Sequence, residues 1–160
     1  MSSDRIKVLG DGKRYAIDNY LVDPLAISLL YLEEPGEREK IGFGKHDAIV
    51  SFAQKSQKQR QKICNNFLTI LEGKVPAAEK TDVTPISYST MGGESYTVPT
   101  WFTTIQGHQL VEYIRQAAPF LNKYGDDKKL FKKIITLSYG NYPEIIPMEV
   151  VDTLKKIQEA

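Results

Sequence analysis

Cysteine and histidine are scarce in this chain of 160 residues, and their scarcity excludes several kinds of site. Cys64 is the only cysteine, so neither an internal disulfide nor a cluster of thiolate ligands can form. The two histidines, His46 and His108, lie in separate segments and lack the spacing of a zinc site. A chain of this length can bury a sizeable core unaided. We therefore expect a fold that is stabilised by packing rather than by disulfides or metals.

Long apolar runs and a dominant charge are also missing. No segment approaches the roughly 20 consecutive apolar residues that a membrane helix needs. The first residues lack the apolar stretch of a signal peptide. The formal net charge is only +1, so contact with nucleic acid would have to come from a local basic patch. We expect a cytoplasmic protein that does not associate with membranes.

The patterns that are present predict an α+β fold that is mainly α-helical, with one compact domain spanning residues 1–160. Helix signals recur along the chain, among them Asp23-Pro24 as a start and Pro119 as a stop. They predict five or six helices. Residues 6–9 have the composition of a short strand that ends at a glycine-rich turn. Alternating residues on both sides of Gly92-Gly93 predict a β-hairpin near residues 85–98.

The segment Leu25–Leu32 predicts a helix that is apolar on nearly all sides. Such a helix is either buried or covered by a partner, because exposing it would leave a large hydrophobic patch. The sequence leaves both alternatives open. Contact with a protein partner or with a second copy through Leu25–Leu32 is therefore one of our expectations.

Two clusters of cations lie at predicted helices. The first contains Lys55, Lys58, Arg60 and Lys62, interleaved with glutamines, and the second comprises Lys128-Lys129 with Lys132-Lys133. Either cluster could follow a phosphate backbone, where affinity comes from the release of counterions. The alternative is a solvated helix face, which is the more common fate of a charge run.

Three single residues need an individual interpretation. His108 follows Gly107 at a helix start, where an imidazole could donate to an anion, act as a general acid or bond the end of its own helix. Asp18 is the acidic residue of the N-terminal segment that neither a turn nor a helix cap explains, which makes it a candidate carboxylate for a metal. Cys64 lies on an apolar stripe and is interpreted as a core residue.

Two segments of the chain resemble a known family. Arg14–Pro24, which reads RYAIDNYLVDP, resembles the R-x-x-I-E-N-Y-L-L-D-P stretch late in the TOPRIM nuclease domains of OLD-type (overcoming lysogenization defect) ATPases and related defence proteins. Further along, Pro99-Thr-Trp101 followed by Gly107-His108-Gln-Leu110 resembles the P-x-W … G-K-x-L stretch of those proteins. The likeness covers roughly residues 5–120, although its specific motifs are short.

The resemblance implies particular roles. TOPRIM enzymes hold divalent metal through a glutamate and an Asp-x-Asp that precede the matched stretch, and this chain contains no Asp-x-Asp. Asp18 stands where the family keeps a glutamate that helps to hold metal, and His108 stands where it commonly keeps a lysine near the scissile phosphate. Lys13 and Arg14 are expected to contact anions beside His108. Mg²⁺ or Mn²⁺ is expected only if a partner supplies further ligands, since two-metal cleavage needs several carboxylates.

We therefore expect a non-catalytic or split TOPRIM-related protein of a bacterial or phage nucleic-acid or defence system. Three explanations stay open for the missing ligands: a degenerate binding module, a chain completed by a partner, or a fragment of a longer reading frame. The alternative function is a protein-interaction or inhibitor domain with no nucleic-acid role. Its contact surface would contain Leu25–Leu32 and the aromatic residues Tyr88, Tyr96, Trp101 and Phe102.

Overall fold

The helix α3 (Pro24–Tyr31) forms the core of the protein, and all eight of its residues are buried. Asp23 caps its N-terminus by accepting a hydrogen bond from the Leu25 amide at 3.0 Å. The helix is covered by α4 (Gln57–Glu72) and by a π-helical segment, Ile134–Tyr139. The chain itself therefore buries this apolar segment. The expected contact with a partner through Leu25–Leu32 is wrong, because these residues are not on the surface.

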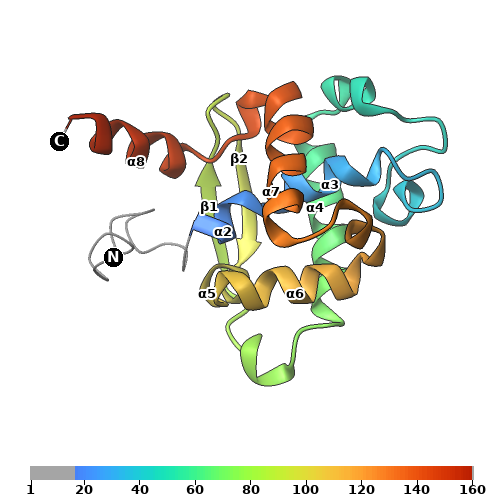
Figure 1. The fold of residues 1–160 in the computed structure, drawn as a ribbon, viewed down its shortest axis with the longest axis horizontal. Helices are drawn as coiled ribbons and strands as arrows, with labels where there is room; N and C mark the ends of the chain where they lie inside the picture. The colour runs from blue at the N-terminus through green and yellow to red at the C-terminus, as the bar shows by residue number, and fades with distance from the viewer. Residues whose placement is uncertain (1–16, 160) are drawn as a thin grey trace.

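The computed structural model describes residues 17–159, and 64% of it is helical, with one antiparallel hairpin in a single compact domain. The predicted fold class is confirmed, although the described residues form seven α-helices rather than the predicted five or six. The strand predicted at residues 6–9 lies outside the described residues. The remaining regular elements are α2 (Ile17–Leu21), β1 (Pro85–Ser89), β2 (Ser95–Pro99), α5 (Thr100–Thr104), α6 (Gly107–Ala117), α7 (Asp127–Lys133) and α8 (Met148–Glu159), joined by short 3₁₀ turns (Figure 1).

The helix α4 packs one face on α3 and leaves the other exposed. Ser56 caps it in a reciprocal pair with Gln59: the Gln59 amide donates to Ser56 Oγ, and the Ser56 amide donates to Gln59 Oε1. Cys64 lies on the buried face and is 1% exposed, as expected of a core residue. Burial raises the pKa of its thiol well above the ordinary value.

The register of the β1–β2 hairpin accommodates a proline in each strand. Pro85 lies opposite Pro99, and Ser87 lies opposite Thr97. Both backbone polar groups of Thr97 bond a side chain of α4, so they point away from β1. Because the direction alternates along a strand, the amide position of Pro99 also points away from β1. Neither proline therefore removes a hydrogen bond from the ladder.

The C-terminal third follows its capping signals. Pro119 ends α6 and begins a 3₁₀ turn, and Asp126 caps α7 by accepting a hydrogen bond from the Lys129 amide at 2.9 Å. The π-helical segment after α7 is anchored to the core, since Ser138 Oγ donates to the Ala26 carbonyl at 2.6 Å. The last helix, α8, contacts β1 and extends away from the rest of the protein (Figure 1). Within residues 17–159, no helix combines the length and apolarity needed to cross a bilayer.

Candidate functional site

The structure brings Asp18 and His108 together, although they are far apart in the sequence. Asp18 lies in the first turn of α2, and His108 is the second residue of α6. The two helices are in contact, and the Asn19 side chain donates to the Ile105 carbonyl at 2.8 Å, which fixes α2 beside the start of α6. We call this place, where Asp18, Gly107 and His108 meet, the α2–α6 corner.

Gly107 makes this close approach of the two helices feasible. A Cβ atom at this position would lie 2.7 Å from Asp18 Cβ, 3.1 Å from Asn19 Oδ1 and 3.3 Å from Asp18 Oδ2. Real Cβ atoms essentially never come that close to another carbon. The absence of a side chain therefore lets the Asp18 carboxyl lie directly beside the first residue of α6. In the sequence, this glycine stands out only as the neighbour of His108.

Further charged residues surround His108. Its Nε2 lies 3.4 Å from Glu112 Oε1, and its Nδ1 lies 3.6 Å from Asp127 Oδ2. These are long contacts, and the side chain is 70% exposed, so water competes with both. Asp127 is held more firmly by Arg115, whose Nη2 and Nε donate to Asp127 Oδ1 at 3.0 and 3.2 Å. The imidazole thus remains within reach of a ligand.

The carboxyl of Asp18 is more easily protonated than that of an ordinary aspartate. Partial burial raises its pKa, the negative charge of Asp127 raises it further, and His108 lowers it by a smaller effect. A protonated imidazole that is exposed can donate a hydrogen bond to a phosphate oxygen.

These residues do not fit the two-metal centre that the family resemblance implies. Such a centre needs several carboxylates that converge on the ions. Here Arg115 engages Asp127, and Glu112 lies on the exposed side of α6 beside His108. In the part of the chain that the structure describes, no group of three or more His, Cys, Asp or Glu side chains could hold a metal ion.

The first basic cluster is only partly a surface. Arg60 was expected among the phosphate contacts, but it is 5% exposed and points into the protein. Its Nη2 donates to the Phe52 carbonyl at 3.0 Å, its Nη1 lies 3.4 Å from Glu94 Oε1, and its Cζ lies 4.1 Å from the centre of the Phe52 ring. Because a buried guanidinium cannot reach a phosphate, the prediction for Arg60 is wrong. Its role is to join α4 to the hairpin.

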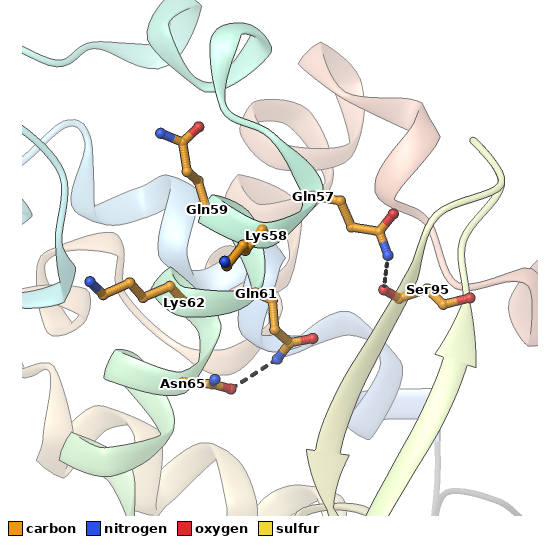
Figure 2. A pocket seen from close by; sticks show the side chains of 7 residues that line it. All are labelled: Gln57, Lys58, Gln59, Gln61, Lys62, Asn65 and Ser95. Carbon is orange, nitrogen blue, oxygen red and sulfur yellow. Dashed lines mark hydrogen bonds between the residues drawn. The ribbon is translucent and has the colours of Figure 1, made fainter.

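The lysines and the glutamines around Arg60 make different contacts. Lys55 pairs with Asp47 at 3.0 Å, whereas Lys58 and Lys62 are exposed. Gln57 Nε2 donates to the Ser95 carbonyl at 2.7 Å, and Gln61 exchanges two hydrogen bonds with the backbone of Thr97, at 2.8 and 3.0 Å. Figure 2 shows Gln57 directed at Ser95, with Lys62 pointing away from the hairpin. The glutamines therefore seal the outer edge of β2 rather than contact a ligand.

The structure tests the predicted aromatic interface but not the predicted roles of Lys13 and Arg14. Lys13 and Arg14 lie outside the described residues, so their predicted role stays a prediction. The four aromatic residues proposed for a protein interface are at most 5% exposed. That predicted interface is therefore wrong, because its side chains belong to the core. Sequence reasoning missed Glu112, Arg115 and Asp127, since no pattern in the sequence indicates that α6 and the start of α7 meet.

The chain was also compared with known proteins. No family model, no curated protein and no solved structure matches it.

Proposed function

We propose that this chain is a TOPRIM-related protein of a bacterial or phage nucleic-acid or defence system, acting in the cytoplasm. It contacts nucleic acid at the α2–α6 corner and is not a complete nuclease by itself. The observation that carries the proposal is the contact between Asp18 and the start of α6, where His108 lies. These are the two positions at which the family resemblance expects a metal-holding carboxylate and a cation near the scissile phosphate.

His108, Arg115 and Asp18 have separate roles in this contact. His108, when protonated, donates to a phosphate oxygen of the bound strand, and its high exposure leaves room for that contact. Arg115 holds Asp127 beside the imidazole, which makes it a positioning residue. Asp18 is a residual carboxylate of the family site. Mg²⁺ or Mn²⁺ would bind only after a partner protein contributes the acidic ligands that these residues do not supply.

A binding assay tests the role of His108. We expect His108→Ala to weaken binding of a fluorescein-labelled oligonucleotide about three- to tenfold, because one charge-assisted contact is lost. We expect His108→Lys to bind at least as tightly as the unmodified chain, since lysine carries a full charge at neutral pH. His46→Ala, at an exposed position outside the corner, is the matched control and should bind normally.

Two outcomes would contradict the proposal. Equal affinity of His108→Ala and His46→Ala would remove the corner from the binding surface. Cleavage of DNA or RNA by the isolated chain in Mg²⁺ or Mn²⁺, abolished by Asp18→Ala, would show that the chain needs no partner for catalysis.

A further inference from the structure

The outward face of α7 combines lysines with exposed apolar side chains. Lys128, Phe131, Lys132 and Ile135 line a shallow hollow of about 380 Å³, and Ile135 is 48% exposed. Their spacing of three and four residues places all four side chains on one side of the helix. We call these four residues, together with Lys129, the α7 face. Phe131 and Ile135 form its apolar part, and Lys128 and Lys132 lie beside them, one helical turn apart.

The lysines of this face differ from their neighbours in forming no ion pair within residues 17–159. Two other lysines nearby are paired: Lys133 lies 3.0 Å from Glu33, and Lys123 forms an ion pair with Glu34. Among residues 17–159, Lys128, Lys129 and Lys132 form no ion pair with any carboxylate. In the described part of the chain, the face therefore carries positive charge without an ion-pair partner, which suits an anionic ligand.

The shape of the face is fixed by the core beneath it. Leu130 and Ile134 alternate with the exposed residues and are fully buried. The π-helical segment that contains Ile135 is held by the bond from Ser138 to Ala26. Ile135 is thus exposed on an anchored segment.

We infer that the α7 face binds single-stranded nucleic acid, with phosphates at Lys128 and Lys132 and a base against Phe131 and Ile135. A single strand offers alternating anionic groups and unstacked base faces, and sequence-tolerant binding combines cations with stacking platforms in this way. A duplex hides its base faces and would leave the apolar part of the face without a contact. An acidic peptide could pair with the lysines, but its carboxylate side chains do not stack on Phe131.

The position of the face connects it to the α2–α6 corner. Asp127, the first residue of α7, lies 3.6 Å from His108, and Lys128 is the next residue. A strand bound at His108 can therefore continue along α7. The inference rests on the proposed function for its ligand class, and it adds the kind of strand and the surface that this strand follows.

Fluorescence anisotropy with a short labelled oligothymidylate tests the inference on the full chain. We expect Lys128→Gln/Lys132→Gln to weaken binding about tenfold or more, and to reduce the slope of log affinity against log salt by about 1.4, the value for two lost phosphate contacts. Lys45→Gln/Lys74→Gln, at two exposed positions outside α7, removes the same charge and is the matched control. It should change the affinity less than about twofold, because neither lysine belongs to the α7 face.

The stacking contact needs separate variants. We expect Phe131→Ala to weaken oligothymidylate binding about fivefold or more, and Phe131→Tyr to retain it, because the tyrosine keeps the ring. Phe131 also packs against the core, so Ile135→Ser, at an exposed position, repeats the test without a risk to folding. It should weaken binding to the single strand and leave the melting temperature unchanged.

Each outcome decides between the two proposals. Normal binding by the α7 double variant, equal affinity for a duplex of the same length, or equal competition by polyglutamate would overturn the inference. If His108→Ala binds weakly while the α7 double variant binds normally, the proposed function survives and the inference fails. The reverse result supports the α7 face and removes His108 from the site. Absence of binding to every oligonucleotide would overturn both.

Discussion

The helices α4 and α7 both begin with a run of cations, yet the folded protein uses the two runs differently. In the first run, Arg60 enters the core, Lys55 pairs with Asp47 just before α4, and glutamines bond the outer edge of β2. Only Lys58 and Lys62 of this run stay exposed, among those glutamines. On α7, three lysines of the run remain exposed beside apolar side chains. What distinguishes the runs is the set of groups that the rest of the chain brings to each helix. A cluster of cations in a sequence is therefore a set of candidates, and tertiary contacts decide which of them a ligand can reach.

The strongest way to break this comparison is to change Arg60. We expect Arg60→Ala to lower the free energy of unfolding by about 2–4 kcal/mol, because the Phe52 carbonyl loses its partner in a buried place. Lys58→Ala, on the exposed side of the same helix, should cost no more than about 0.5 kcal/mol. Urea unfolding of the two variants measures the difference. If Arg60→Ala were as stable as Lys58→Ala but bound nucleic acid more weakly, Arg60 would be a surface contact for nucleic acid after all.

A change at Gly107 tests the packing of α2 on α6, at the corner that lies beside the start of α7. We expect Gly107→Ala to cost about 1–3 kcal/mol, since the new Cβ would lie 2.7 Å from Asp18 Cβ and push α2 away from α6. Gly36→Ala is the matched control, because nothing lies within 4 Å of a Cβ placed there. Thermal unfolding should separate the two variants. A Gly107→Ala variant as stable as the control would mean that α2 and α6 do not need this close approach.

The smallest expected effect is a pH-dependent change in stability when Asp18 of the α2–α6 corner is replaced. The folded protein raises the pKa of Asp18, so it favours the protonated carboxyl more than the unfolded chain does. This contribution to stability is complete below the ordinary pKa near 4 and is lost as the pH rises through the raised value. Asp18→Asn should therefore melt at the same temperature as the unmodified chain in acid and up to about 2 °C higher at neutral pH, since water screens a half-exposed group.

Calorimetry at several pH values checks this prediction. Asp127→Asn should reduce the difference between Asp18→Asn and its parent, because Asp127 is the negative charge that raises the Asp18 pKa. A neutral-pH melting temperature that falls in Asp18→Asn would contradict the account. It would mean that the ionised carboxylate is stabilised by its neighbours.

The features that the sequence predicts correctly depend on local chemistry. Asp23 caps its helix as the Asp23-Pro24 start indicates, and Gly92-Gly93 lies in the turn of the hairpin. The incorrect predictions concern what covers a segment. Periodicity shows that Leu25–Leu32 must be covered, but it cannot show that α4 and the π-helical segment provide the cover. In the same way, Arg60 looks like its neighbours in the sequence until Phe52 and Glu94 are placed beside it.

The sequence predicts part of the candidate site. It indicates Asp18 as an unexplained acid and His108 as a histidine at a helix start, and only the family resemblance implies that the two belong to one site. Their contact depends on α2, a short helix in a segment whose mixed composition gave no clear prediction. It also depends on Gly107, where the necessary property is the missing side chain. Long-range contacts of this kind leave no mark in local composition.

The burial of Cys64 has a practical consequence. A thiol that is 1% exposed and whose pKa is raised remains protonated, and the thiol form reacts poorly with maleimides and other electrophiles. A single cysteine introduced on the α7 face, for example Lys129→Cys, should accept a fluorophore while the native cysteine stays unmodified. Site-specific dyes can thus report on each surface of this protein without first replacing its own sulfhydryl group.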